Sequence, residues 1–346
     1  MPSLPRLTPL VPVVLALCVV ASASPTAGAD VDAPPFPVSG AFFGASIGKQ
    51  IDPDLPECRH PNAVTARTRF EDPECVAGFV YLDREFYLWD GHKATGQMWP
   101  TDYARWSRDQ GHRLMMSFKP KRLDGARLQW GDIAAGMHDA EIDAHAQRVA
   151  AFGAPVYLTF HAEPEYNGAG GRFGTADQYR AAWRRIVQRF RDAGATNATW
   201  VLTLMGWTFQ GASGRNPFDY YAGSAYVDAV AVDAFNYYDC RGTANTWKSF
   251  GKLFQRPYDW IAARGKPMLV GEWGSVEHPD DPDAKARWLR YAGRWIKSHP
   301  NLKALTYLSF RDHSPETGRD CDWTVDTTLR SLLAFRELVA DPYFTP

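Results

Sequence analysis

A repeated alternation of short apolar segments with longer amphipathic segments constrains the fold of this chain most strongly. The apolar segments have the composition of buried β-strands and lie at residues 113–118, 156–160, 200–204, 229–235, 268–270 and 304–310. The amphipathic segments are predicted helices at residues 101–111, 141–151, 175–193, 247–263, 283–298 and 328–340. Strands that each precede a helix form a parallel sheet covered by helices, so the sequence predicts an α/β protein.

The number of predicted strands favours a closed barrel over an open sheet. Residues 41–47 and 76–82 are two further apolar segments, which brings the total to about eight, the number in a (β/α)8 barrel. No glycine-rich phosphate loop follows the first strand, which argues against a dinucleotide-binding fold. We therefore expect residues 41–346 to form one domain, a single (β/α)8 TIM barrel.

The first 40 residues are expected to lie outside this barrel. Residues 1–29 have the features of a secretory signal peptide, with Arg6, an apolar core over 10–20 and an Ala-Gly-Ala cleavage site before Asp30. Residues 30–40 are polar and proline-rich, as in a linker or an N-terminal arm. No later segment approaches the ~20 apolar residues of a membrane span. We expect a secreted, extracellular protein with no membrane partner.

The cysteines fit an exported protein. Cleavage of the signal peptide removes Cys18 and leaves Cys58, Cys75, Cys240 and Cys321, an even number in an oxidising compartment. Three pairings are possible. We favour Cys58–Cys75, which closes a short polar loop, together with Cys240–Cys321, since both of these follow late strands at one end of the fold. A zinc site is disfavoured because the chain has no Cys-x-x-Cys and no His-x-His.

The charge and aromatic content narrow the class of partner. The chain has 38 Lys and Arg against 39 Asp and Glu, and no long run of either sign. This balance argues against nucleic acid or an anionic membrane surface as a partner. The 13 Trp, 15 Tyr and 19 Phe are plentiful; part of them serves the core, but Trp and Tyr also stack on sugar rings and other flat apolar faces. Nothing in the sequence indicates an obligate partner, so we expect a monomer.

Two strand ends carry carboxylates. The predicted fourth strand is followed by Glu163 and Glu165, and the predicted seventh by Glu272. In a (β/α)8 barrel functional residues lie at the C-terminal ends of the strands, and strands four and seven approach one another across the mouth. Two carboxyl groups there suit glycoside hydrolysis, in which one protonates the leaving oxygen and the other attacks the anomeric carbon. This chemistry requires neither a metal nor another cofactor.

Three segments resemble secreted members of glycoside hydrolase family 26, a family of retaining (β/α)8 hydrolases. They are VYLTFHAEPEYNG, KPMLVGEWGS and DWTVDTTLRSLLAFRELVADPYF, and the resemblance extends from about residue 100 to the C-terminus. It implies endo-acting hydrolysis of β-1,4-mannan or related β-glycans with retention of configuration. It also implies an acid/base Glu after strand four and a nucleophilic Glu after strand seven.

The resemblance transfers catalytic roles to individual residues. Glu272 takes the nucleophile position. The acid/base motif of the family is similar to Arg-x-x-His-Glu-x-Asn-Gly, and gapless strand register places its Glu on Glu163, with Thr159 in place of the Arg and Ala162 in place of the His. Matching Glu-x-Asn-Gly instead selects Glu165. Strand register favours Glu163, with Glu165 as the alternative.

Further residues near the strand ends are candidates for binding the sugar. The family has a hydroxyl-bearing aromatic residue that bonds the nucleophile; Phe235 stands at this position and Tyr237 is the nearest substitute. Trp207 and Trp273 are candidate stacking platforms, and His161 could supply an imidazole near Glu163. The predicted binding residues are His161, Asn167, Lys119, Trp207, Asn236, Tyr237 and Trp273.

These observations predict a secreted retaining glycosidase that cleaves β-1,4-linked mannan-type polysaccharide by double displacement, an endo-1,4-β-mannosidase. An endo-β-glucanase acting on mixed-linkage or another β-glycan is the alternative within the same enzyme class. A non-catalytic carbohydrate-binding barrel is a third reading, which the departures Ala162 and Phe235 favour. A metal-dependent barrel hydrolase is disfavoured because the His and carboxylate residues do not cluster as ligands in the sequence.

Overall fold

The computed structural model describes residues 34–47, 81–93, 95–167, 171–211, 214–242, 246–314 and 317–346. The predicted signal peptide, the first part of the predicted strand 76–82, and the predicted Cys58–Cys75 pair lie outside these residues. Within them, no helix is long and apolar enough to cross a membrane.

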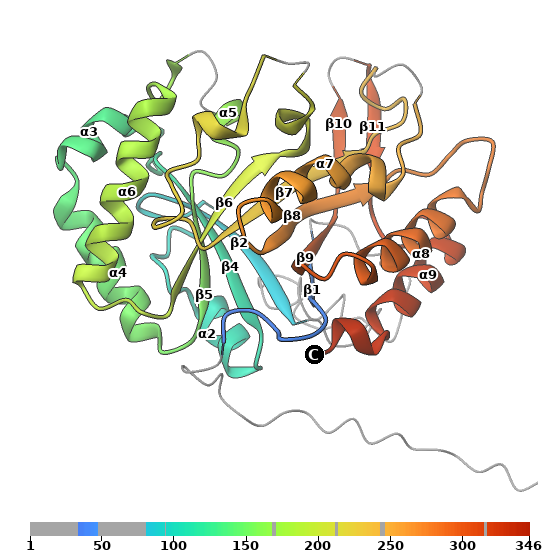
Figure 1. The fold of residues 1–346 in the computed structure, drawn as a ribbon, viewed down its shortest axis with the longest axis horizontal. Coiled ribbons are helices and arrows are strands. Elements are labelled where there is room, and N and C mark those ends of the chain that lie inside the picture. The colour runs from blue at the N-terminus through green and yellow to red at the C-terminus, as the bar shows by residue number, and fades with distance from the viewer. Residues whose placement is uncertain are drawn as a thin grey trace, which may run out of the picture.

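The fold is a closed barrel of parallel strands (Figure 1). Strand β1 pairs in parallel with both β2 and β9, which closes the ring. A short strand, β3 (Gly91–His92), pairs antiparallel with β2 outside the ring. The predicted (β/α)8 fold is therefore confirmed. The barrel strands are β1 (Phe42–Ile47), β2 (Leu82–Leu88), β4 (Arg113–Lys119), β5 (Val156–Phe160), β6 (Ala198–Met205), β7 (Ala229–Asn236), β8 (Met268–Ser275) and β9 (Leu302–Ser309).

Helices surround the barrel, as Figure 1 shows. Two of them begin at capping threonines: the Thr101 and Thr175 side chains accept bonds from the backbone N–H groups of Ala104 and Gln178, which satisfies donors that the helix leaves free. The helices are α2 (Asp102–Asp109), α3 (Trp130–Ala135), α4 (Asp139–Phe152), α6 (Ala176–Asp192), α7 (Phe250–Ala262), α8 (Ala284–Lys297) and α9 (Leu329–Val339).

Shorter elements lie between the strands and helices. Helix α5 and the hairpin β10–β11 both lie in the upper part of the view in Figure 1, and each follows the carboxyl end of a barrel strand. The short elements are α5 (Pro164–Asn167), the 3₁₀ helices η3 (Gly206–Gln210), η4 (Pro217–Asp219) and η5 (Pro342–Phe344), and the strands β10 (Arg311–Ser314) and β11 (Arg319–Asp322).

One predicted strand shares only its last residue with the observed element. The second strand was expected over 76–82, of which residues 76–80 lie outside the described part of the chain, and β2 runs from Leu82 to Leu88. Its sequence LDREFYL contains charged residues that conceal a buried strand. Asp83 and Arg84 are 3% and 2% exposed, and Arg84 is bonded inside the barrel by Asp233. Buried charges are tolerated only with such partners, which a local sequence pattern does not show.

The barrel separates two apolar layers. One cluster lies between the strands and the helices and contains most of the buried aromatic residues. A smaller cluster fills the barrel interior, as expected for a packed barrel core. Its members are Phe42, Leu82, Met115, Tyr157, Val201, Ala229, Ala231, Leu269 and Ala304.

Residues 34–40 pack as an arm against the interior cluster. The Phe36 ring stacks on Tyr157, with centroids 5.6 Å apart and planes 13° apart. The Tyr157 hydroxyl donates to the carbonyl oxygen of Pro35, and the Ala41 N–H donates to the carbonyl oxygen of Tyr343 at 3.0 Å. The segment 30–40 was expected to be a linker or an arm, and its described part, residues 34–40, contacts the barrel.

A disulfide joins two loops at the mouth. Cys240, after β7, is bonded to Cys321 in β11, with Cα atoms 5.3 Å apart. The Thr317 hydroxyl donates to the carbonyl oxygen of Cys240 at 2.6 Å and reinforces the connection. The predicted Cys240–Cys321 pair is confirmed.

The arm gives a stability prediction. Phe36→Ala should lower the free energy of unfolding by about 1–2 kcal/mol, because it removes a stacked aromatic contact on the barrel core. Val38→Ala is the matched control, since Val38 is 94% exposed and should change stability little. Urea denaturation followed by circular dichroism measures both. Equal stabilities of the two variants would show that the arm does not stabilise the barrel.

Candidate active site

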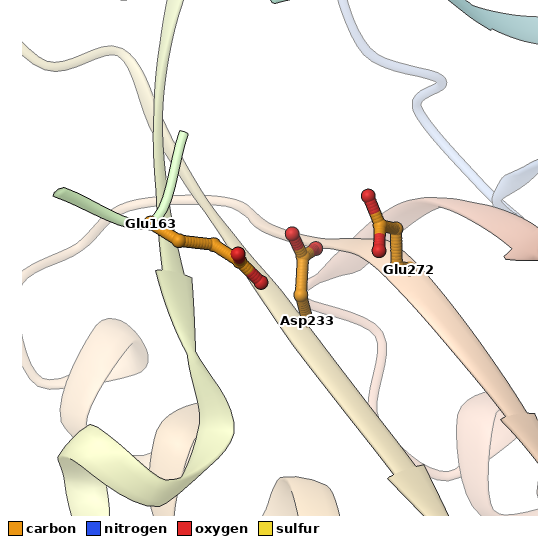
Figure 2. Close-up of side chains that lie close together, drawn as sticks. All are labelled: Glu163, Asp233 and Glu272. Carbon is orange, nitrogen blue, oxygen red and sulfur yellow. The ribbon is translucent and has the colours of Figure 1, made fainter. Parts of the chain in front are cut away.

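Three carboxyl groups converge at the barrel mouth. Figure 2 shows Glu163, Asp233 and Glu272 side by side with their carboxyl groups directed toward one another. An oxygen of each lies within 4.8 Å of an oxygen of the other two. Glu163 follows β5, Asp233 is in β7 and Glu272 is in β8. The two strand ends that were predicted to meet therefore do so, together with a third carboxylate.

The chain turns sharply where Glu163 is placed. His161 and Glu163 both have positive φ angles, 48° and 54°, in the left-handed region that L-residues rarely occupy. Such residues cost of order 1–3 kcal/mol each and persist where surrounding bonds hold them. Here the His161 N–H donates to the Phe118 carbonyl at 2.8 Å and the Glu163 N–H to the Thr203 carbonyl at 3.0 Å. The turn is thus fixed to both neighbouring strands, and it directs Glu163 toward Glu272.

Irregular strand pairing places Asp233 and Glu272. The register of β7 against β8 shifts between Val232 and Asp233, and that of β8 against β9 shifts between Val270 and Trp273. Such irregularities redirect side chains and occur often next to active sites. After the shift, Asp233 lies directly opposite Glu272.

An arginine from β2 links two of the carboxylates. The Arg84 Nη1 and Nη2 atoms lie 3.1 and 3.2 Å from the two oxygens of Asp233. Nη2 also lies 3.4 Å from Oε1 of Glu272. The Arg84 side chain is fully buried. A bidentate pair of this kind fixes orientation as well as charge, so Arg84 and Asp233 together hold Glu272 in place.

The environment raises the pKa of both predicted catalytic groups. Burial, followed by the charges of Asp233 and Glu272, raises the pKa of Glu163 well above its usual range. Burial and Asp233 raise the pKa of Glu272 to about 7, and the positive charge of Arg84 opposes this rise. Since Arg84 contacts Glu272, its charge favours the ionised form there. The arrangement therefore favours a protonated Glu163 beside an ionised Glu272.

The alternative acid/base residue, Glu165, has other partners. It is 3% exposed, and its Oε1 accepts bonds from the Met205 N–H at 2.6 Å and the Thr208 hydroxyl at 2.9 Å. Burial raises its pKa to about 7. Thr208 belongs to η3, so Glu165 fixes this short helix. The geometry supports Glu163 as the acid/base residue, which stays a prediction.

A cleft opens beside the carboxylates, with space for about 230 Å³ of solvent. The predicted binding residues Trp207 and Tyr237 line it. The Arg215 guanidinium stacks on Trp207, 3.9 Å from the ring centroid. The lining residues are Met205, Gly206, Trp207, Gln210, Asp233, Ala234, Phe235, Tyr237, Lys248, Lys252 and Leu253.

Tyr237 and Lys119 lie close enough to the carboxylates for the carboxylate charges to shift their own pKa values. Burial raises the pKa of the Tyr237 hydroxyl, and the charges of Glu163 and Glu272 raise it further. Lys119 ends β4; burial lowers its pKa, while Glu163 raises it. Phe235, at the position of the hydroxyl-bearing aromatic of the family, is 7% exposed and packs on Trp323 with centroids 4.6 Å apart.

The predicted binding role of His161 does not agree with its position. The side chain is 1% exposed and packs on Phe173, with centroids 4.5 Å apart. Its Nδ1 accepts a bond from Trp130 Nε1 at 3.0 Å. Burial lowers its pKa well below the usual value. The left-handed turn at His161 directs the ring into this aromatic cluster, so it is a structural residue here.

Trp273 and Asn236 were also predicted to bind the sugar, and both side chains are buried. Trp273 is fully buried and packs against Trp288 and Tyr307 in the outer layer, because side chains alternate along a strand and Glu272 takes the inward position. Asn236 is also fully buried. Its amide donates to the Ser275 hydroxyl and its oxygen accepts from the Lys248 N–H, both at 2.9 Å. Asn167 ends α5, and its side chain lies outside the described part of the chain.

Sequence reasoning missed Asp233 and Arg84. Asp233 had a visible signal, since a carboxylate closes the apolar run AVAV in strand 229–235. Arg84 had none, because the second strand was placed too early. Among the described residues, Glu163, Asp233 and Glu272 are close enough together to share a metal ion. Arg84 supplies a positive charge to two of them, Asp233 and Glu272.

The salt bridges give a titration prediction. Arg84→Met should raise the pKa of Glu272 above about 7, because it removes the charge that favours the ionised form. It should also lower the stability by about 3–5 kcal/mol, the usual consequence of removing one partner of a buried pair. Arg290→Met, at an exposed pair with Glu337, is the control. Carboxyl ¹³C NMR titration of glutamate-labelled protein measures the pKa. An unchanged or lower value for Glu272 would contradict the role of Arg84.

Comparisons with known proteins agree with this architecture. No protein-family model matches the chain. Endoglucanase H of Acetivibrio thermocellus is 29% identical over 252 residues, which are 71% of this chain and 26% of that protein. The chain thus corresponds to a minor part of that longer relative.

Solved structures with the same fold cover most of the chain. A modular endo-β-1,4-mannanase from Cellulomonas fimi, of glycoside hydrolase family 26, superposes with a TM-score of 0.55 at 17% identity, over 88% of this chain and 71% of that one. The catalytic domain of the GH26 endo-β-1,4-mannanase from Bacillus sp. JAMB-750 has a TM-score of 0.58 at 16% identity, over 88% of both chains. The resemblance predicted from the sequence is therefore confirmed: the chain has the fold of the glycoside hydrolase family 26 enzymes.

Proposed function

We propose that this protein is a secreted retaining glycosidase that cleaves β-1,4-linked mannan-type polysaccharide by double displacement. The observation that carries the proposal is a short distance between the two carboxyl groups: an oxygen of Glu163 lies within 4.8 Å of an oxygen of Glu272. Retaining enzymes place their two carboxyl groups about 5–5.5 Å apart, whereas inverting enzymes separate them by about 6.5–9.5 Å to admit a water. The short separation favours a covalent intermediate.

In the first step Glu163 is the general acid and Glu272 the nucleophile. The Glu272 oxygen bonds to the anomeric carbon while the glycosidic C–O bond breaks, and Glu163 gives its proton to the departing oxygen. In the second step the Glu163 carboxylate removes a proton from water. The water oxygen then displaces Glu272 from the anomeric carbon and restores both residues.

Arg84 and Asp233 act through Glu272. Their bidentate pair holds the guanidinium 3.4 Å from the nucleophile. A fixed positive charge there stabilises the ionised nucleophile before the reaction and again when Glu272 leaves the sugar. The preorganised carboxylate pair supports turnover rather than binding alone, despite the departures at Ala162 and Phe235.

The glycan is proposed from the relatives. The similar solved structures are named endo-β-1,4-mannanases. A second candidate is an endo-β-glucanase, which the name of the 29% identical relative favours. Both substrates are β-linked pyranose chains, so the same carboxylate pair serves either.

Export is proposed from residues 1–29 and from the disulfide. Cys240–Cys321 is the kind of bond that persists in an oxidising compartment and is rare in the cytosol. We therefore place the catalytic domain, residues 41–346, outside the cell after signal-peptide cleavage.

The catalytic assignment is tested with conservative variants. Glu272→Gln should lower kcat by at least about 10³-fold and Glu163→Gln by about 10²–10⁴-fold, because each loses one essential group. The measurement is reducing-end release from β-mannan, glucomannan, galactomannan, mixed-linkage glucan and xylan. ¹H NMR of the first product should show the β-anomer. Appearance of the α-anomer first, or full activity of Glu272→Gln, would refute the mechanism.

Glu165 provides a separate test of the acid/base assignment. Glu165→Gln keeps the oxygen that accepts from Met205 and Thr208, and it should retain most activity. Glu165→Ala leaves both donors unpaired at about 1–3 kcal/mol and loosens η3, so it should raise KM more than it lowers kcat. Steady-state kinetics on the preferred glycan measures both variants. A loss of kcat in Glu165→Gln equal to that of Glu163→Gln would transfer the acid/base role to Glu165.

A further inference from the structure

We infer that Phe86 is a stacking platform for the second sugar on the glycone side of the cleft. The expected ligand is a β-1,4-linked pyranose ring, whose C–H face packs on aromatic rings. This inference rests on the proposed glycosidase function and extends it to a residue outside the family motifs described above.

Strand β2 directs Phe86 into the barrel mouth. Side chains alternate along a strand, so Leu82, Arg84 and Phe86 share one face. Leu82 belongs to the interior cluster, and Arg84 reaches Asp233 inside the barrel. Phe86 is therefore the next inward position, above Arg84, toward the carboxyl ends of the strands.

The Phe86 ring is exposed next to the catalytic groups. Its relative exposure is 43%, and the Arg84 guanidinium covers one face at 4.9 Å from the ring centroid. Arg84 in turn lies 3.4 Å from Glu272. Single exposed apolar residues are common on protein surfaces. Phe86 differs because it lies in the barrel mouth and contacts Arg84, which in turn contacts the proposed nucleophile Glu272.

A buried hydroxyl accompanies the ring. Ser117 of β4 is the register partner of Phe86 and shares the inward face with Met115 of the interior cluster. It is 5% exposed, and its Oγ has no hydrogen-bond partner among the described residues. Buried polar atoms are nearly always satisfied in the working protein. A sugar hydroxyl, or a water that a sugar holds, provides the missing partner.

The position of β2 in the ring gives a path for the polysaccharide. Around the barrel the strands follow the order β1, β2, β4, β5, β6, β7, β8, β9, so β2 stands opposite β7. The Trp207 cleft is built from the ends of β6 and β7. A line from Phe86 to this cleft passes between Glu163, which follows β5, and Glu272 on β8. A chain along this line presents one linkage to the carboxylate pair.

The contacts of Phe86 and of the Trp207 wall indicate which end of the cleft holds the glycone and which holds the leaving group. Phe86 is connected to the nucleophile through Arg84. The wall that carries Trp207 is anchored by Glu165, two residues after the proposed acid. The sugar that bonds to Glu272 is the first glycone sugar, so Phe86 contacts the second. Trp207 then lies on the leaving-group side.

Aryl glycosides isolate the glycone side, because the aryl group replaces the leaving-group sugars. We would compare Phe86→Ala and Phe86→Tyr with wild type, using 4-nitrophenyl β-glycosides of mannose, glucose and their β-1,4-linked disaccharides. Phe218→Ala is the matched control. Phe218 is 52% exposed and also stacks on an arginine, Arg264, at 4.2 Å, but it packs on Trp260 outside the barrel.

Phe86→Ala should lower kcat/KM for the disaccharide substrates by about tenfold, a loss of one ring contact. It should change the monosaccharide substrates little, and Phe86→Tyr and Phe218→Ala should resemble wild type. An effect of Phe86→Ala no larger than that of Phe218→Ala would overturn the inference, and so would equal losses on both substrate lengths.

The proposed function can fail separately. If wild type releases no nitrophenol and no reducing ends from any glycan, the glycosidase proposal fails. Binding of manno- and cellotetraose to wild type and Phe86→Ala, measured by calorimetry, then decides the platform. Weaker binding by Phe86→Ala than by wild type supports the platform. Equal binding by the two proteins, or no binding by wild type, overturns it.

Discussion

The structure depends on how one buried arginine balances three carboxyl groups, of which Asp233 is buried and Glu163 and Glu272 are partly buried. Glu163, Asp233 and Glu272 lie within 4.8 Å of one another, where like charges repel and burial opposes ionisation. Arg84 contacts two of them from the opposite wall of the barrel. Its positive charge is closest to Asp233 and Glu272, so it favours the ionised form of these two groups more than that of Glu163. One is left protonated beside one that is ionised, which is the condition for acid and nucleophile to work together.

The positions of these charged groups depend on local irregularities in an otherwise regular barrel. The interior core fills the barrel below the mouth, and the arm residue Phe36 packs on it. Above that core, a left-handed turn at Glu163 and the shifted pairing at Asp233 redirect side chains into the mouth. The mouth is then shaped by secondary contacts, since Glu165 anchors the wall that carries Trp207. Strain and burial are concentrated where the chemistry is proposed.

Much of the frame was predictable, and the failures have physical causes. Alternating apolar and amphipathic segments predicted the barrel, and Cys240–Cys321 followed from strand order. The helix starts predicted at residues 101 and 175 coincide with the capping threonines Thr101 and Thr175. Arg84 was missed because a buried charge is explained only by a partner 149 residues away. Trp273 was assigned to the cleft because the sequence does not show which face of a strand points inward once the pairing shifts.

The most direct test of the retaining mechanism is to trap the covalent intermediate. The fluorine of a 2-deoxy-2-fluoro glycoside slows both steps of the reaction. A good leaving group keeps the first step faster than the second, so the covalent glycosyl-enzyme accumulates. Mass spectrometry of the digested protein should then find one fluorosugar on the peptide containing Glu272. Labelling of Glu163 or Asp233, or no label in an enzyme that hydrolyses its glycan, would contradict a double displacement through Glu272.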